Sequence, residues 1–333
     1  MTGPSIAVFG AGLVGARHVV QAAEQANLAA VVDPSPAAAA LAAKYGAPHF
    51  DDPMACLDAM QPDGVVIATP NALHADHALP CLARGIPVLI EKPIADTLAN
   101  ADRIVEASAR HYVPVLVGHH RRHNPIIEQA KATIAEGALG DIVAVAGQFW
   151  LYKPDDYFDV GWRTRAGGGP IMINCIHDID LLRYLVGEVD EIRAMRSSAQ
   201  RGQAVEDTAA ILIRFASGAL GTFSVSDTVV APWSWELSSG ENPMYPHLPE
   251  SCYRIGGTKA GLSLPDLRLW QHDGPRSWWS PMTQEQITVH AQDAFVRQFS
   301  HFIAVIGGTE PRVSASEGRA SLAATLRCLA GAG

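Results

Sequence analysis

A glycine-rich junction between a strand and a helix constrains this chain more than any other feature. Residues 6–9 form an apolar run typical of a buried strand, and Gly10-Ala11-Gly12-Leu13-Val14-Gly15 follows directly. Residues 13–26 then have a helical pattern, with Arg17, His18, Gln21 and Glu24 on the more polar side. In such a unit, Gly10 permits the turn, Gly12 lets backbone approach a pyrophosphate, and Gly15 lets the helix pack close to the strand. The pattern predicts a dinucleotide-binding site at the start of this helix.

An acidic residue stands where such a unit binds ribose. The apolar run 28–32 ends at Asp33, 18 residues after Gly15. A carboxylate there accepts hydrogen bonds from the ribose hydroxyls of NAD and repels the 2′-phosphate of NADP. No Arg or Lys follows before Lys44, so NAD is the expected cofactor and NADP is disfavoured. The alternative is that Asp33 only begins the next turn and caps the helix after it.

Composition indicates a globular enzyme. The 333 residues suffice for two domains, and 48% hydrophobic with 18% charged residues is ordinary for such a protein. A net charge of −9 without a basic stripe argues against a nucleic-acid partner. The absence of a long apolar stretch or a signal-peptide pattern predicts a cytoplasmic protein without a membrane partner. Five widely separated cysteines suit reduced thiols: Cys56, Cys81, Cys175, Cys252 and Cys328.

The rhythm of the chain changes near residue 120. Before it, strand-like runs at 6–9, 28–32, 64–68, 86–90 and 113–117 alternate with helical stretches, as in a doubly wound parallel sheet. After it come helices at 125–136, 171–186, 291–306 and 316–329, strands at 142–150, 191–199, 207–215 and 219–228, and a loop at 232–249. The predicted fold is α/β, with an N-terminal Rossmann domain (1–120) and a C-terminal α+β domain (121–333) whose open sheet is largely antiparallel.

A lysine follows the fourth predicted strand, in Glu91-Lys92-Pro93. The carboxyl ends of strands in a doubly wound sheet face the ligand crevice, so Lys92 is expected to point at the nicotinamide. A desolvated ammonium there can polarise a hydroxyl or carbonyl and take part in proton transfer. The alternative is a solvated lysine paired with Glu91.

Further motifs follow the glycine-rich junction in order. They are Thr69-Pro70-Asn71-x-x-His74, Glu91-Lys92-Pro93, Gly118-x-x-Arg121-Arg122-x-x-Pro125, and Gly167-Gly168-Gly169 leading to His177-x-x-Asp180. Together they resemble the Gfo/Idh/MocA oxidoreductase family over almost the whole chain. The resemblance implies an NAD-dependent oxidoreductase that transfers hydride to or from a secondary alcohol or ketone of a sugar, cyclitol or related polyhydroxy compound. It also implies a homodimer or homotetramer formed through the C-terminal sheet.

The resemblance assigns roles to single residues. Lys92 and His177 are the expected catalytic residues, and the imidazole, whose ordinary pKa lies near neutral pH, takes the hydroxyl proton. His120 is expected near the nicotinamide ribose. The expected cofactor-binding residues are Gly10, Gly12, Leu13, Val14, Asp33, Thr69, Pro70, Asn71, His74, Glu91, Lys92, Pro93 and His120.

One position departs from the family pattern. Many members carry an Asp four residues before the catalytic histidine, and this chain has Ile173 there. Asn174, three residues before His177 and on a neighbouring helical face, is expected to hold substrate or the imidazole ring in its place. Asp178 is expected to point roughly 100° away from His177, and Asp180 to be structural.

The loop 152–165 mixes aromatic and charged side chains suited to a polyhydroxylated ring or, through an arginine, to a carboxylate. The alternative is a solvated loop with one buried tryptophan. The expected substrate-binding residues are Asn174, His120, Tyr152, Trp162 and Arg163. Histidines at 74/77 and 119/120/123 have spacings found in zinc sites, but no cysteine or carboxylate joins them, so no metal site is predicted.

Two other functions stay open at this point. Some proteins of this architecture resemble NAD-dependent glycoside hydrolases, and others are nucleotide-sensing regulators without catalysis. Ile173 keeps the regulator possible, whereas Lys92 and His177 argue against it.

Overall fold

The computed structural model describes residues 3–330, which form two compact units. The first unit runs to His120 and also contains Phe295–Ala323, while the second contains Arg121–Ala294 and the chain from Ala324. The sequence-based division differs, because it left all of 121–333 in the second domain. The return segment packs on the first unit through its apolar face: a side chain at Gly64 would collide with Ile306 and Phe302. A helical period alone does not show which of two sheets an amphipathic helix covers.

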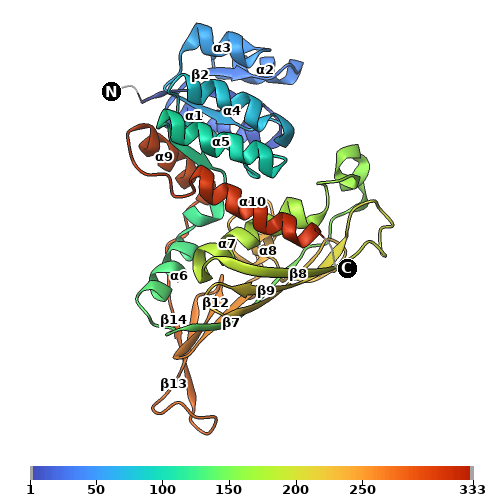
Figure 1. Ribbon diagram of the computed structural model, residues 1–333, viewed down its shortest axis with the longest axis vertical. Helices are drawn as coiled ribbons and strands as arrows, with labels where there is room; N and C mark the ends of the chain where they lie inside the picture. Colours follow the sequence, from blue (N-terminus) through green and yellow to red (C-terminus); the bar gives the residue numbers. More distant parts are fainter. Residues whose placement is uncertain (1–2, 331–333) are drawn as a thin grey trace. The chain divides into compact units, whose positions relative to one another are not determined.

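The first unit is a six-stranded parallel sheet in the order β3-β2-β1-β4-β5-β6, surrounded by helices (Figure 1). Its strands are β1 (Ser5–Phe9), β2 (Asn27–Val32), β3 (His49–Phe50), β4 (Gly64–Ile67), β5 (Val88–Ile90) and β6 (Val115–Val117). Its helices include α1 (Leu13–Gln25), α2 (Pro36–Lys44), α3 (Pro53–Met60), α4 (His74–Ala83), α5 (Leu98–His111) and α9 (Ala294–Ile306). The predicted doubly wound sheet is confirmed. Only β3 was missed, since two residues carry no recognisable period.

Backbone hydrogen bonds hold the loops at one edge of this sheet together. Because all six strands are parallel, their carboxyl ends meet at that edge. Gly10 N–H donates to Val32 O at 2.7 Å, and Ala68 N–H donates to Phe9 O at 2.7 Å. Two further bonds extend the row: Glu91 N–H to Ile67 O at 2.9 Å, and Gly118 N–H to Ile90 O at 2.7 Å. The fold therefore aligns the glycine loop, Asp33, Thr69, Lys92 and His120 along one edge.

The second unit is an eight-stranded sheet in the order β14-β13-β12-β11-β7-β10-β9-β8, antiparallel except for the pair β7–β10. The predicted, largely antiparallel sheet is confirmed. The strands are β7 (Ile142–Trp150), β8 (Val189–Ser197), β9 (Thr208–Phe215), β10 (Leu220–Ser226), β11 (Tyr253–Gly257), β12 (Ala260–Leu264), β13 (Arg268–His272) and β14 (Met282–Gln286). The last four were not predicted, because they are short and carry Gly or a run of exposed residues that hides the alternation.

Helices cover one face of this sheet (Figure 1). Helix α6 (Pro125–Ala135), helix α7 (Ile176–Val186) and the end of α10 (Ala315–Leu329) share a core with inward-facing residues of the strands. Asn124 caps α6 by accepting the Ile126 N–H at 2.9 Å. Two buried ion pairs join the start of the unit to α7. Arg121 Nη1 lies 2.8 Å from Asp178 Oδ1, and Arg122 binds both oxygens of Asp180.

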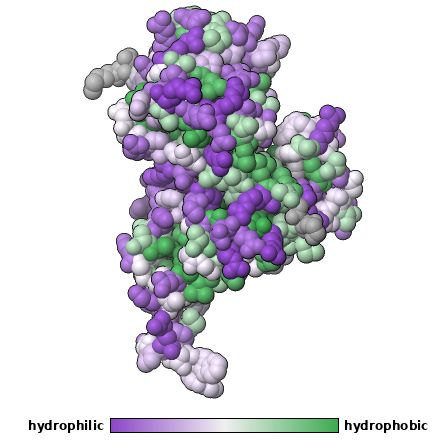
Figure 2. Space-filling view, viewed as in Figure 1, coloured by the Kyte–Doolittle hydropathy of each residue, from purple (hydrophilic) through white to green (hydrophobic). Residues whose placement is uncertain are grey.

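Two local features differ from a plain strand-and-loop description. The segment 232–249, predicted as a loop, contains the short helix α8 (Trp235–Ser238), which Ser234 caps. The β13–β14 hairpin extends away from the body of the second unit (Figure 1), and its end is white to purple in the space-filling view (Figure 2). Although Trp278 and Trp279 are exposed there, polar neighbours surround them, so the hairpin end is not a continuous apolar surface.

Candidate active site

The three glycines of the first loop have different reasons to be glycine. Gly10 has φ +89°, and a Cβ there would lie 2.5 Å from Ala68 O. A Cβ on Gly15 would collide with Gly10 O. In contrast, a Cβ on Gly12 would meet nothing within 4 Å. The fold itself thus requires Gly10 and Gly15, whereas the open space at Gly12 fits the close approach of a pyrophosphate.

The start of α1 presents free donors and apolar surface. Gly12 is its N-cap and supplies no side-chain cap, and the first turn contains no acidic residue. Leu13 is 86% exposed and Val14 is 39% exposed, which is unusual for apolar residues at the edge of a core. Unsatisfied N–H groups at a helix start attract anions. The residues present fit a dinucleotide whose phosphates lie on these N–H groups.

Asp33 joins the glycine loop to the turn before α2. Its Oδ2 accepts the Ala11 N–H at 2.9 Å, and its Oδ1 accepts the Ser35 N–H at 2.9 Å. The turn-forming role and the ribose-binding role are therefore compatible, since each carboxylate oxygen has a second lone pair. Partial burial raises the pKa of Asp33, but hydrogen bonds from Ser35 and Ala11 lower it more, so the net shift is downward. The carboxylate stays ionised, which suits NAD and opposes a 2′-phosphate.

His74 is buried between two loops at the edge of the parallel sheet. It is fully buried, with Nδ1 2.9 Å from Pro93 O and Nε2 2.9 Å from Thr69 O. Burial lowers the pKa of this imidazole. The ring ties the loop after β4 to the loop after β5, and its expected contact with the cofactor stays a prediction. Pro70 and Asn71 are exposed on the same loop.

Glu91 has a buried partner that the sequence analysis placed elsewhere. His18 Nε2 donates to Glu91 Oε1 at 2.8 Å, and the Lys92 N–H donates to Glu91 Oε2 at 3.2 Å. His18 is fully buried, although its position on α1 predicted the polar side, because the Phe295 ring of α9 packs 4.4 Å from its ring. Burial raises the pKa of Glu91, whereas the hydrogen bond from His18 and its charge lower that pKa. The lowering effects are together larger, so the pKa of Glu91 lies below its ordinary value.

Lys92 and His120 follow neighbouring strands of the parallel sheet. Lys92 is the second residue after β5 and is half-buried, so it is not the fully solvated lysine of the alternative interpretation. His120 follows β6 and is also half-buried, with its ring 6.5 Å from that of Phe295. Both side chains belong to the edge that carries the dinucleotide loop.

In the second unit, the turn before His177 is a π-helix. It covers Ile171–Cys175, and α7 begins at Ile176. The single helix predicted over 171–186 is wrong in this part, because the wider turn breaks the 3.6-residue period that placed Ile173 on the face of His177. His177 itself is 7% exposed in the first turn of α7. Such π-turns are frequent at functional sites.

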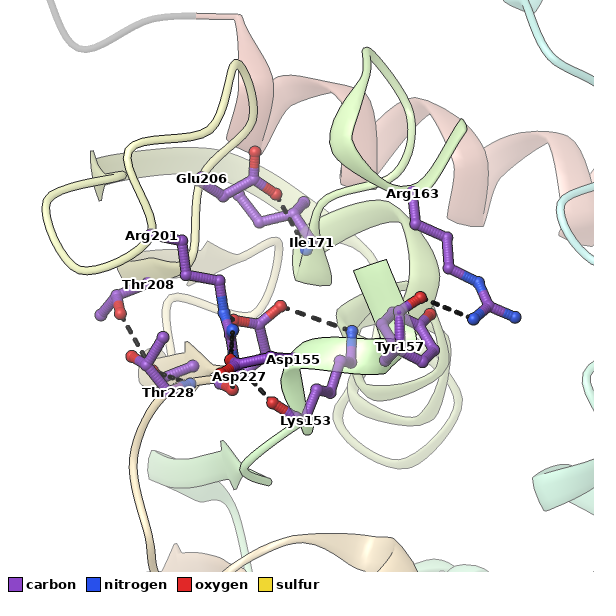
Figure 3. A network of polar contacts seen from close by, with 11 residues as sticks. Lys153, Asp155, Tyr157, Arg163, Ile171, Arg201, Glu206, Thr208, Asp227 and Thr228 are labelled. Carbon is purple, nitrogen blue, oxygen red and sulfur yellow. Dashed lines mark hydrogen bonds and ion pairs between the residues drawn. The ribbon is translucent and has the colours of Figure 1, made fainter. Parts of the chain in front are cut away.

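Asn174 and Tyr152 line one cavity of the second unit, which has a volume of about 900 Å³. Trp162 and Arg163 are not among its lining residues. Trp162 is 53% exposed, so it is not a buried tryptophan either. The Arg163 guanidinium lies 4.0 Å from the centre of the Tyr157 ring and donates to Tyr157 O at 2.7 Å (Figure 3). Arg163 is thus engaged within its own loop, and its expected role as a substrate ligand stays a prediction.

Lys153 is a candidate that the sequence analysis did not select. It is 6% exposed and lines the same cavity, and its Nζ lies 3.6 Å from Asp227 Oδ2. Burial lowers the pKa of Lys153, which Asp227 partly opposes. Arg201 binds Asp227 and donates to Lys153 O at 2.7 Å, which fixes this loop (Figure 3). Its only sequence signal was a lone lysine directly after an aromatic strand end.

The described residues contain neither a metal-binding cluster nor a helix able to cross a membrane. Between residues 3 and 330, no cluster of three or more His, Cys, Asp or Glu side chains is arranged to hold a metal ion. Over the same range, the helices are too short or too polar to span a bilayer.

Comparisons with known proteins agree with this geometry. Residues 5–119 match the oxidoreductase family with an NAD-binding Rossmann fold, and residues 127–263 match the GFO/IDH/MocA C-terminal domain. The rhizopine catabolism protein MocA of Rhizobium meliloti is 31% identical over 231 residues, which are 68% of this chain and 72% of that protein. The inositol 2-dehydrogenase of Rubrobacter xylanophilus is 32% identical over 248 residues, which are 70% and 67%.

A solved structure shows the same fold. The WlbA dehydrogenase from Bordetella pertussis, in complex with NADH and UDP-GlcNAcA, superposes with a TM-score of 0.80 at 24% identity and covers 99% of this chain and 96% of that one. The resemblance inferred from the sequence motifs is thereby confirmed. The chain belongs to the Gfo/Idh/MocA family of oxidoreductases, and its N-terminal part is an NAD-binding Rossmann domain.

Proposed function

We propose that this protein is an NAD-dependent dehydrogenase acting on a secondary alcohol of a sugar, cyclitol or related polyhydroxy compound, or on the matching ketone. One observation carries the proposal. Lys92 follows β5 on the same sheet edge as the glycine loop after β1 and Asp33 after β2. A half-buried ammonium beside a dinucleotide-binding loop has an acid/base or polarising role available to it. The names of relatives, such as inositol 2-dehydrogenase, support the polyol class.

The residues of the chain would act as follows. NAD, when bound, supplies the acceptor or donor of hydride. We assign the proton of the reacting hydroxyl to the His177 imidazole and a polarising role to the Lys92 ammonium. Asn174 and Tyr152 orient the substrate. Asp33, Thr69, Pro70 and Asn71 hold the nucleotide, with the N–H groups that follow Gly12.

Incubation of the full chain with NAD and a panel of polyols, sugars and sugar acids tests the proposal. Net accumulation of NADH, followed at 340 nm, supports a dehydrogenase. Cleavage of a glycoside without net NADH indicates the NAD-dependent hydrolase. Binding of NAD with neither product indicates a nucleotide-sensing regulator. The same panel with NADP measures cofactor preference.

We also propose that two or four copies associate through the open face of the second unit's sheet. Several apolar side chains there are exposed, among them Leu212 at 59% and Leu220 at 53%, next to the positive charge of Arg193. A continuous surface of this kind is typical of an interface between subunits. Sedimentation analysis of the parent and of Leu212→Arg tests this, since a charge at the centre of the interface should yield monomers.

We propose a cytoplasmic location because the cysteines carry free thiols. The five cysteines are free and buried, and burial raises the pKa of Cys56, Cys81 and Cys328 to about 12. Such thiols are unreactive and suit a reducing compartment. Fractionation of the native cells tests the proposal.

A further inference from the structure

The cavity of the second unit has a small polar end. Asn174 Oδ1 is a buried atom without a hydrogen-bond partner among the described residues. The buried Lys153 Nζ forms an ion pair with Asp227 Oδ2 at 3.6 Å, which is longer than a hydrogen bond. Both residues line the cavity. An ammonium offers three donors and an amide oxygen offers an acceptor. Leaving the amide oxygen unsatisfied is costly, and the ammonium has more donors than its one carboxylate partner uses. This end is therefore suited to a ligand that presents both an oxygen acceptor and a hydroxyl donor.

The rest of the cavity wall is apolar and aromatic. The rings of Tyr152, Tyr157 and Tyr245, with Val230 and Leu248, make most of it, and the exposed Glu250 is its one charged residue. Four of these residues expose much of their surface: Val230 at 84%, Tyr152 at 47%, Leu248 at 42% and Tyr245 at 39%. Single exposed apolar residues are ordinary, but a group of them in one concave site marks a binding surface.

Two arginines pack on aromatic rings of the loop that carries part of the wall. Arg163 stacks on Tyr157 at 4.0 Å, and Arg201 stacks on Phe158 at 4.2 Å while it binds Asp227 (Figure 3). The cavity volume of about 900 Å³ lies in the upper part of the range of about 300–1,000 Å³ found for sites of drug-sized ligands. A bare cyclitol or hexose would contact the polar end and leave the aromatic wall uncovered.

We propose that this cavity binds a polyhydroxy ring that carries an apolar, aromatic-sized substituent. Lys153 and Asn174 bind oxygens of the ring, and the wall of Tyr152, Tyr245, Val230 and Leu248 covers the substituent. Lys153 and this wall are then specificity-determining residues. The inference rests on the proposed dehydrogenase and narrows its substrate class from free polyols to their aryl derivatives.

Matched glycosides test this class. Methyl and phenyl β-D-glucopyranoside, and the same pair for galactose, are titrated into the full chain saturated with NAD, with binding followed by saturation-transfer NMR and calorimetry. We expect the phenyl member of at least one pair to bind about 10-fold or more tightly, because the phenyl ring removes its apolar surface from water. Phenyl and methyl glycosides that bind equally, or neither binding, would overturn the inference.

The same valine-to-serine change, made inside and outside the cavity, tests whether the wall causes the phenyl preference. Val230→Ser, in the wall, should reduce the phenyl-to-methyl preference several-fold. Val160→Ser, at a valine that is 42% exposed and outside the cavity lining, should leave the preference unchanged. Both side chains are exposed enough for the fold to tolerate the change. An equal loss of preference in the two variants would contradict the assignment of the wall.

The polar end is tested separately. Lys153→Met and Asn174→Ala should each weaken both members of a glycoside pair by a similar factor, about 10-fold, and leave the phenyl preference intact. Far-ultraviolet circular dichroism checks that each variant is folded. A failure of the proposed function has a different signature: a phenyl preference in binding without NADH formation, or with release of phenol, would retain this inference and reject the dehydrogenase.

Discussion

His18 and Glu91 form a buried hydrogen-bonded pair that joins the helix of the dinucleotide loop to the residue before Lys92. Nε2 lies 2.8 Å from Oε1, His18 is fully buried, and the Glu91 side chain is 13% exposed. A carboxylate held in this way fixes the peptide of Lys92, whose N–H it accepts. The pair therefore connects the fold of the first helix with the position of a proposed catalytic residue.

Removing one partner of this pair should cost more than removing both. His18→Leu leaves a buried carboxylate without its donor, and we expect a loss of about 1–3 kcal/mol in the free energy of unfolding. The double variant His18→Leu with Glu91→Gln should recover part of that loss. Urea unfolding of the parent, of His18→Leu, of Glu91→Gln and of the double variant gives the coupling energy. Additive effects would show that the pair does not stabilise the loop.

Gly12→Ala should separate cofactor binding from folding. A methyl group at Gly12 meets no protein atom, so we expect the free energy of unfolding to change by less than about 1 kcal/mol. NAD affinity should fall at least 10-fold, because the methyl group occupies the approach of the pyrophosphate. Gly10→Ala is the contrasting variant, since its Cβ collides with backbone and φ is positive; it should unfold at lower urea. Unchanged NAD binding by Gly12→Ala would contradict the proposal that the pyrophosphate approaches the backbone at Gly12.

Asp33→Ala should change cofactor preference. Loss of a charged hydrogen-bond acceptor at the ribose is expected to weaken NAD binding by about 10-fold or more, with a smaller effect on NADP. Asp51→Ala, at an exposed carboxylate nearby, removes the same charge and serves as the control. Fluorescence titration with both nicotinamides measures the ratio, and an equal loss for the two cofactors would argue that Asp33 acts only on the turn.

Lys92→Ala and His177→Asn should each lower turnover of the substrate by about 10²- to 10⁴-fold, the ordinary cost of losing an acid/base group. NAD affinity should change little for His177→Asn. Initial rates of NADH formation on the substrate found by the panel check this. Turnover within a few-fold of the parent in either variant would remove that residue from the mechanism.

Asp178 should make stability depend on pH. Burial raises its pKa from 3.8 to about 6, against the opposing effect of Arg121 and with a further contribution from Glu236. The folded protein therefore binds more protons than the unfolded chain between these values, and stability falls as pH rises through them. Relative to Asp178→Asn, the parent should lose about 1–3 kcal/mol of unfolding free energy between pH 4 and pH 7. Urea unfolding at four pH values measures it, and a parent that gains stability relative to Asp178→Asn as pH rises would contradict the assignment.

Local sequence patterns were sufficient to predict which site residues lie together at the edge of the parallel sheet. The glycine loop, Asp33 and Lys92 could be placed together from sequence, because parallel strands bring their carboxyl ends to one edge whatever else the fold does. The strand pattern in the sequence also predicted β7 at its observed bounds. It failed for β14, whose five residues are all exposed, because alternation is visible only where one face is buried.

The family, the parallel sheet and the dinucleotide loop could be predicted from the sequence alone, since these depend on short-range periods and on glycines at one strand–helix junction. Which side chains become buried against distant parts of the chain is set by the packing of helices and sheets. This packing placed His18 under Phe295 of α9, turned Ile173 and Asn174 through a π-helix into a cavity, and enclosed Lys153 with Asp227. These contacts join residues far apart in the chain, and their burial depends on how helices and sheets pack, which local periodicity does not encode.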